Sequence, residues 1–117
     1  MRTSNFATCA QHPDAVSIAG WPPPWFAGHK FKLLAPTRRI LDDYKRTNDS
    51  NIFTKRFYED VLSKLDAQEI FDKLGERAIM ICYEKPGEFC HRRLVARWLE
   101  TELGILVPEY VEQHSLL

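Results

Sequence analysis

The residues between positions 84 and 92 are the most concentrated group of reactive side chains in the sequence. Cys90, His91 and Arg92 follow one another directly, and Glu84 precedes them by six residues. A cysteine beside a histidine and an arginine favours the thiolate, the form that attacks electrophiles and binds metal ions. Arg92 can donate two parallel hydrogen bonds to a phosphate or a carboxylate. This segment therefore predicts a site for an anionic ligand.

Cys90 and Glu84 each have two interpretations. Cys90 acts as a nucleophile if a base lies nearby, or it packs as a small buried side chain, as free cysteines often do. The phosphate loop of tyrosine phosphatases needs an arginine six residues after its cysteine, where this chain has Ala96. Glu84 serves as a general base or forms an ion pair with Lys85 or Arg92. We take Cys90 and Glu84 as the candidate catalytic residues.

A metal site has less support. A metal site would draw on Cys9, His12, Cys82, Cys90 and His91, of which Cys9 and His12 have the C-x-x-H spacing of a ligand pair. Cys82 lies in an apolar segment and is expected to belong to the core. Neighbouring helical residues project in different directions, so Cys90 and His91 are not expected to share one ion, and no second pair has the spacing of a zinc knuckle. We predict no metal ligand, and the sequence identifies no cofactor.

The candidate site needs a strand and a helix that meet at one edge of a sheet. Residues 78–83, A-I-M-I-C-Y, form an apolar run typical of a central strand in a parallel sheet. The amphipathic segment after Cys90 predicts a helix that ends at Gly104. Ligands of such sheets bind beyond the carboxyl ends of the strands, where unpaired helix amides attract anions. The predicted anion-binding residues are Arg92, His91, Lys85, Thr3, Ser4 and Asn5.

Strands and helices alternate along the rest of the chain. Strands are expected at residues 2–7 and 15–19, and an edge strand at residues 105–111. Helices are expected from Pro36, from a cap at Asp49 or Ser50 to residue 65, and from Asp66 to Gly75. This order predicts one α/β domain over residues 1–117, with a small, mostly parallel sheet flanked by helices in a reduced, Rossmann-like or flavodoxin-like three-layer arrangement.

The segment 20–36 contains three consecutive prolines and several aromatic residues, so it is expected to form a long loop. Residues 1–58 carry nine Lys and Arg against four Asp and Glu. Aromatic and basic side chains together are typical of surfaces that stack bases and bind phosphates. The candidate nucleic-acid residues are Trp25, Lys30, Lys32, Arg38 and Arg39. The alternative is that the rings of this loop pack into the core.

The composition limits the class of protein. Of the 117 residues, 44% are hydrophobic and 27% are charged, which is typical of one folded domain and excludes a disordered polyelectrolyte. Sixteen basic residues balance sixteen acidic ones, so overall charge indicates no particular partner. Three cysteines are too few for the disulfide framework of a small secreted protein, and no apolar run is long enough to cross a bilayer. We expect a cytoplasmic protein without a membrane partner.

The segment C-Y-E-K-P-G-E-F-C-H-R, residues 82–92, resembles the hallmark of the family called Domain of Unknown Function 488. In that family a hydrophobic strand ends in C-x-E-K, and C-H-R opens the last main helix. The resemblance extends to T-S-N-F, S-I-A, W-F-x-G and L-A-P, at residues 3–6, 17–19, 25–28 and 34–36. It implies a compact α/β fold with a polar pocket at the start of the C-H-R helix, and it implies no particular activity.

Three functional hypotheses follow. The first is an intracellular enzyme that binds a phosphate-bearing or other anionic small molecule, such as a nucleotide, and uses Cys90 or Glu84 for chemistry. The second is a non-catalytic nucleic-acid module that uses the basic half and the aromatic loop. The third is a structural or interaction domain in which Arg92 stabilises the fold through a buried ion pair with Glu84. The first hypothesis requires Arg92 and the helix amides to face an open cavity.

Overall fold

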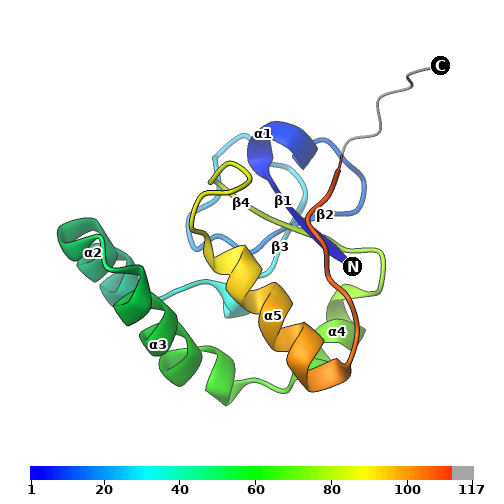
Figure 1. Cartoon of the computed structure of the whole chain (residues 1–117). Helices are drawn as coiled ribbons and strands as arrows, with labels where there is room; N and C mark the ends of the chain where they lie inside the picture. Colours follow the sequence, from blue (N-terminus) through cyan, green and yellow to red (C-terminus); the bar gives the residue numbers. More distant parts are fainter. Residues whose placement is uncertain (112–117) are drawn as a thin grey trace.

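A sheet of four parallel strands forms the centre of the computed structural model, which describes residues 1–111. The strands lie side by side in the order β1 (Arg2–Asn5), β4 (Ile79–Cys82), β2 (Ala15–Ser17) and β3 (His29–Lys30) (Figure 1). β4 lies between β1 and β2, as its apolar sequence predicted, and all of its residues are buried. A strand that is covered on both faces has no polar side to present to water.

Within residues 1–111 the chain also forms five helices and two 3-10 turns, of which all but α5 lie between strands. The helices are α1 (Phe6–Cys9), α2 (Arg38–Thr47), α3 (Ser50–Asp60), α4 (Ala67–Leu74) and α5 (His91–Leu103), and the 3-10 turns are Lys32–Leu34 and Leu62–Lys64. Asp49 and Asp66 cap α3 and α4 as expected, because their side chains accept hydrogen bonds from the first free amides of each helix. Gly104 ends α5 in the left-handed conformation with φ of 66°, which costs glycine little.

The two faces of the sheet are covered unequally. Helices α2 to α5 pack on one face and enclose the larger hydrophobic core, to which β4 contributes Met80 (Figure 1). The other face is covered by α1 and the loop that follows β2, which pack Phe6 and Phe26 against Ile79 and Ile81. The fold class is therefore the predicted α/β class, with helices on both faces of a parallel sheet and only one helical turn on the thinner side.

The helix predicted to reach residue 65 ends earlier. α3 stops at Asp60, and the chain continues through Val61 into the 3-10 turn at Leu62. Both Val61 and Leu62 remain in the larger core. The spacing of apolar residues thus continues through the break, which is why the periodicity did not reveal it.

The predicted strand at residues 105–111 is wrong. The backbone of this segment pairs with the sheet at one isolated bridge, between Thr3 and Glu109, where the Thr3 amide donates to the carbonyl of Pro108 at 3.0 Å and the Tyr110 amide donates to the carbonyl of Thr3 at 2.7 Å. Pro108 has no amide hydrogen to donate, so a continuous ladder cannot form there. The expected loop at residues 20–36 contains the short strand β3, which lies at the opposite edge of the sheet.

None of the helices within residues 1–111 has both the length and the apolar character that a membrane crossing requires.

Candidate functional site

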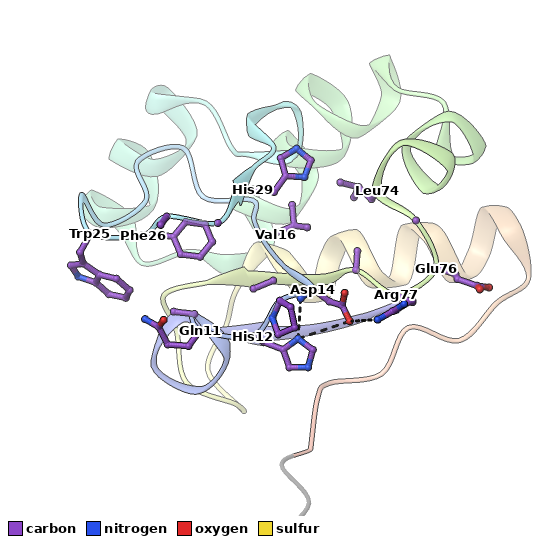
Figure 2. A pocket seen from close by; sticks show the side chains of 17 residues that line it. Gln11, His12, Asp14, Val16, Trp25, Phe26, His29, Leu74, Glu76 and Arg77 are labelled. Atoms are coloured by element: carbon purple, nitrogen blue, oxygen red, sulfur yellow. Dashed lines mark hydrogen bonds and ion pairs between the residues drawn. The ribbon is translucent and has the colours of Figure 1, made fainter.

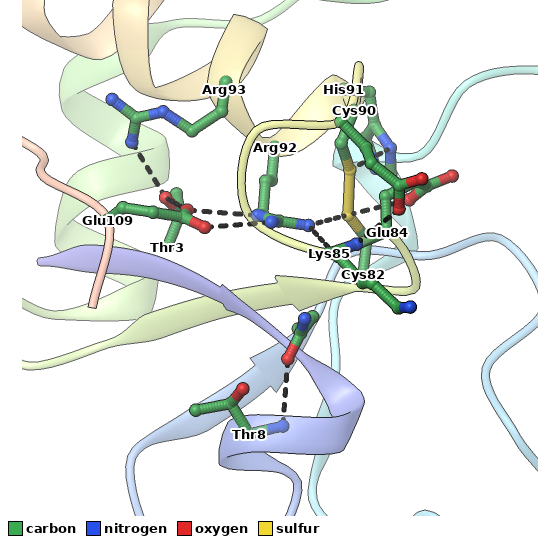
Figure 3. A network of polar contacts seen from close by, with 12 residues as sticks. Thr3, Thr8, Cys82, Glu84, Lys85, Cys90, His91, Arg92, Arg93 and Glu109 are labelled. Atoms are coloured by element: carbon green, nitrogen blue, oxygen red, sulfur yellow. Dashed lines mark hydrogen bonds and ion pairs between the residues drawn. A yellow bond between two sulfur atoms is a disulfide. The ribbon is translucent and has the colours of Figure 1, made fainter. Parts of the chain in front are cut away.

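The carboxyl end of β4 and the amino end of α5 bring two cysteines together (Figure 3). Cys82 is the last residue of β4, and Cys90 is the residue before α5. A disulfide joins the two side chains, and both are buried. Cys90, the predicted nucleophile, is therefore not a free thiolate in this structure, and the free cysteine of the described residues is Cys9. Cys82, which the sequence assigned to the core alone, also belongs to this site.

His91 turns its ring toward the same cluster. Its Nε2 atom lies 2.8 Å from the backbone oxygen of Ile18, so Nε2 carries the hydrogen and donates it. Its Nδ1 atom lies 4.0 Å from the Sγ atom of Cys90. The prediction that these neighbours would point apart is wrong, because Cys90 precedes the helix with an extended backbone (φ −151°, ψ 143°). Burial lowers the pKa of His91 to about 4, so the ring is neutral at neutral pH.

The Arg92 guanidinium is almost fully buried and is bound by the protein's own groups (Figure 3). Its Nε and Nη2 atoms donate to the two carboxylate oxygens of Glu109 at 3.1 and 2.9 Å. Its Nη1 atom donates to the carbonyl of Glu84 at 2.8 Å and lies 3.1 Å from the Sγ atom of Cys82. The buried ion pair expected with the Glu84 carboxylate therefore forms with Glu109 instead. These contacts leave the guanidinium unavailable to the anionic ligand predicted for it.

The carboxylate of Glu109 is fixed by several donors. Thr3 donates its hydroxyl hydrogen to Glu109, and the same hydroxyl oxygen accepts a hydrogen bond of 2.8 Å from Arg93. Partial burial opposes ionisation, but the hydrogen bonds from Arg92 and Thr3 and the charges of Arg92 and Arg93 hold the pKa of Glu109 below its usual range. Thr3, a predicted ligand-binding residue, thus belongs to an internal network that ties the C-terminal segment to β1.

The other predicted anion-binding residues are spread over different positions. The Asn5 side chain accepts a hydrogen bond of 2.9 Å from the amide of Thr8 and caps α1. Ser4 is buried within β1. Lys85 is exposed in the turn after β4, where its backbone amide donates to the Glu88 carboxylate at 3.0 Å. The structure therefore does not gather these side chains around the start of α5.

A cavity of about 260 Å³ opens beside the cysteine pair, at the carboxyl ends of β2 and β4. Its lining includes Cys82, Glu84 and His91 from the predicted segment, together with Lys45 of α2 and Trp21 of the loop after β2. Glu84 is exposed, and its Oε2 atom lies 3.4 Å from the Sγ atom of Cys82. The cavity thus combines a carboxylate, an ammonium group and an indole ring at the edge where ligands of α/β sheets bind.

A larger groove of about 780 Å³ lies near the opposite ends of the same strands (Figure 2). Some of its charged groups are paired with each other. Asp14 lies 3.6 Å from the guanidinium of Arg77, and its backbone amide donates to the Nδ1 atom of His12 at 3.0 Å. Because this groove faces the amino ends of β2 and β4, whereas ligands of parallel sheets bind beyond the carboxyl ends, we regard the smaller cavity as the candidate site.

The five candidate nucleic-acid residues do not share one place. Trp25 lines the larger groove, where its ring packs against Phe6, whereas Arg38 lies over the ring of Trp21 at 4.3 Å. The remaining three residues are exposed. Lys30 lies in β3, Lys32 in the first 3-10 turn and Arg39 in the first turn of α2. The residues thus lie in several successive elements, and the nucleic-acid interpretation stays a hypothesis.

Three residues of this region were not identified from the sequence. Lys45 lies in α2 within no recognisable motif, and Trp21 was noted only as one aromatic residue of the loop. Glu109 lies in the segment that was expected to form a strand. A signal for Glu109 did exist, since a buried arginine requires an anionic partner. The sequence offers sixteen acidic residues for that role, however, and only the fold selects one of them.

The comparisons with known proteins address the family and not the reaction. Residues 8–103 match a family model described as the Active DUF488-N3 subclade. Neither the comparison with curated proteins nor that with solved structures found a match. The matched range covers most of the chain and includes the cysteine pair and the residues between them. The chain therefore belongs to the DUF488 family, as its C-x-E-K and C-H-R motifs predicted.

Proposed function

We propose that this protein is an enzyme that binds a small anionic molecule of the nucleotide type in the cavity beside Glu84. The observation that carries the proposal is the composition of the cavity lining, which includes Glu84, Lys45 and Trp21. Small-molecule sites commonly have apolar walls with a few polar groups that fix the orientation of the ligand. The apolar part of this lining comes from Ala19, Gly20, Pro36 and Leu41.

Lys45 and Trp21 supply two different contacts to such a ligand. The ammonium group of Lys45 can pair with a phosphate. Lys45 thus takes the anion-binding role that the C-H-R motif suggested for Arg92. Trp21 is 51% exposed, so part of its ring remains open to a planar ligand although Arg38 lies over it at 4.3 Å. A molecule with both a phosphate and an aromatic base satisfies the two contacts at once.

Glu84 is the group best placed for chemistry. It follows the central strand by two residues, it is exposed, and it lines the cavity. A carboxylate in this position can take a proton from a water molecule or a substrate hydroxyl, while Lys45 stabilises the negative charge that develops. The description of the matched subclade as active supports a catalytic role over a purely structural one.

The test separates binding from turnover. We expect calorimetry with adenosine monophosphate to show binding to the wild-type protein, weakened about tenfold in Lys45→Ala because a charged hydrogen bond is lost. Glu84→Gln should still bind the nucleotide but should lose product formation, measured by chromatography over a panel of nucleotides. Lys64→Ala and Glu59→Gln are the matched controls, since both side chains are exposed and lie outside the cavity lining.

Two results would contradict the proposal. One is a wild-type protein that binds neither the nucleotide nor inorganic phosphate. The other is a set of four variants that are indistinguishable from one another in binding and turnover. Equal effects in Lys45→Ala and Lys64→Ala would indicate non-specific attraction to the protein surface.

A further inference from the structure

Three side chains of metal-ligating type meet at the junction of β4 and α5 (Figure 3). The Sγ atoms of Cys82 and Cys90 and a ring nitrogen of His91 all lie within 4.8 Å of one another. Thiolates and imidazole are ligands that zinc favours, with Zn–S distances of about 2.3 Å and Zn–N distances of about 2.0–2.1 Å. Modest side-chain shifts would therefore bring all three atoms around one ion.

The ring of His91 is already oriented as a metal ligand. Because its Nε2–H donates to the carbonyl of Ile18, Nδ1 is the nitrogen with the free lone pair, and Nδ1 is the atom that lies 4.0 Å from Cys90 Sγ. Metal-bound histidines almost always donate their other ring nitrogen to a backbone carbonyl, a carboxylate or water. The Ile18 hydrogen bond thus fixes both the tautomer and the ring orientation.

The surroundings of the two sulfur atoms suit thiolates. The Nη1 atom of Arg92 lies 3.1 Å from Cys82 Sγ, and a nearby guanidinium stabilises the deprotonated form of a cysteine. The Cα atoms of Cys82 and Cys90 are 7.6 Å apart, which is longer than the roughly 4.4–6.8 Å usual for disulfides, so once the bond is reduced the backbone allows the two sulfur atoms to separate around an ion. Two thiolates also neutralise a divalent cation, which limits the cost of burying it.

We propose that the reduced chain binds one zinc ion through Cys82, Cys90 and His91. Cys82 and His91 line the cavity, so a fourth coordination position would face it, beside the Glu84 carboxylate. Two cysteines and one histidine are a ligand set of catalytic zinc sites, which keep one position open for water or substrate. The inference rests on the three ligand atoms and holds whether or not the cavity binds a nucleotide.

The disulfide and the metal-bound form exclude each other. Reduction of the bond between Cys82 and Cys90 takes two electrons and two protons from a dithiol, which itself becomes a disulfide, and yields two thiols. Zinc binding then releases the two thiol protons to solvent as both sulfur atoms bond to the ion. The metal content of the protein should therefore depend on its thiol state.

The experiment uses the full chain, reduced with dithiothreitol, transferred to oxygen-free buffer and titrated with Co²⁺ as a spectroscopic substitute for Zn²⁺. We expect one Co²⁺ per chain with thiolate-to-cobalt charge-transfer absorption, and displacement of Co²⁺ by Zn²⁺. Cys82→Ser, Cys90→Ser and His91→Gln should each weaken Co²⁺ binding by at least about 100-fold, because losing a ligand atom costs no less than losing a residue that orients a ligand. Cys9→Ser is the matched control, since it removes the cysteine outside the cluster.

A measurement without variants covers the case in which the serine variants do not fold. Native mass spectrometry of the reduced wild-type chain should show the mass of one zinc less two protons. A reduced chain that is folded by circular dichroism and binds no Co²⁺ would falsify the proposal, as would a Cys9→Ser variant that loses Co²⁺ while Cys82→Ser retains it. Metal binding without nucleotide binding would refute only the proposed ligand, so the two proposals can fail separately.

Discussion

At the residue scale, the dominant feature is a buried arginine whose charge is balanced inside the protein. Arg92 is 1% exposed, and its contacts reach Glu109, the carbonyl of Glu84 and the sulfur of Cys82. Removing one partner of such a pair leaves an uncompensated charge in a medium of low polarity. This gives the C-H-R motif a structural role in addition to its proposed part in metal binding.

We expect Glu109→Gln to lower the free energy of unfolding at neutral pH by about 3 kcal/mol, the lower end for breaking a buried ion pair, since Glu109 keeps some contact with solvent. Because the pKa of Glu109 is lowered in the folded state, its contribution is present above the unfolded pKa and is lost as the pH falls through the folded value. Urea denaturation at several pH values should therefore show that the free energies of unfolding of Glu109→Gln and the wild-type protein become more similar as the pH falls.

Glu102→Gln provides the comparison for that measurement, because Glu102 is an exposed carboxylate on α5. It should differ from the wild-type protein by less than about 0.5 kcal/mol at every pH. A difference between Glu109→Gln and wild type that stays constant down to strongly acidic pH would show that the carboxylate charge is not what stabilises Arg92.

The sequence predicted that residues 84–90 lead from a strand into a helix, but not the way in which the residues of this segment are connected. Glu84, Cys90 and His91 do lie close together, since a strand and a helix that follow one another meet at one sheet edge. The pairing joins Arg92, in the first turn of α5, to Glu109 in the segment that follows the helix, and neither spacing nor periodicity specifies such a contact. The direction of the Cys90 side chain was also beyond prediction, because it depends on the backbone angles of a single residue before the helix.

At the element scale, the local signals that proved reliable were the caps of the helices. Asp66 accepts a hydrogen bond of 3.1 Å from the amide of Glu69, and Asp49 accepts two from the start of α3. These bonds lie within four residues of chain, so the sequence specifies them almost completely. The end of α3 and the absence of the last strand depend instead on how distant segments pack, which local patterns do not record.

We expect Asp66→Ala to lower the free energy of unfolding by about 1 kcal/mol, because the side chain that satisfies the first turn of α4 is lost. Asp66→Asn should recover most of this difference, since the amide oxygen can accept the same hydrogen bond. Thermal unfolding followed by circular dichroism gives the comparison. Equal losses in the two variants would assign the effect to the charge of Asp66 at the helix end and not to the cap.

At the scale of the whole molecule, the segment after α5 closes the β1 edge of the sheet. Val107 is fully buried in the larger core, while Leu106 beside it is 85% exposed. The amide of Val107 donates to the Glu100 carboxylate at 2.9 Å, and its carbonyl accepts from Arg93 at 2.8 Å. This segment therefore stabilises the fold although it forms no strand.

Val107→Ala should lower the free energy of unfolding by about 2 kcal/mol, since the lost methyl groups leave a cavity in a packed core. Leu106→Ala, one residue away, should change it by less than about 0.5 kcal/mol. Denaturant midpoints of the two variants provide the test. Similar losses in both would mean that the segment contributes through its backbone contacts and not through burial of Val107.

The fold class was readable from the order of the elements, because strands joined by helices favour a parallel sheet with helices on its faces. The central position of β4 followed from its apolar sequence. The short strand β3 was not predicted, since two exposed residues, His29 and Lys30, carry no alternation to recognise. The unequal covering of the two faces also came only from the structure, as it depends on how the loop after β2 places Phe26.

Arg92 donates hydrogen bonds both to the carboxylate of Glu109 and to the carbonyl of Glu84. These bonds connect the segment after α5 to the wall of the cavity. A substitution of Glu109 would consequently disturb the turn that carries Glu84, although residue 109 itself contacts no ligand. In a mutational screen for activity, such a substitution would be mistaken for the loss of a catalytic residue. Only a melting curve recorded alongside the assay would reveal that the scaffold, and not the chemistry, had been altered.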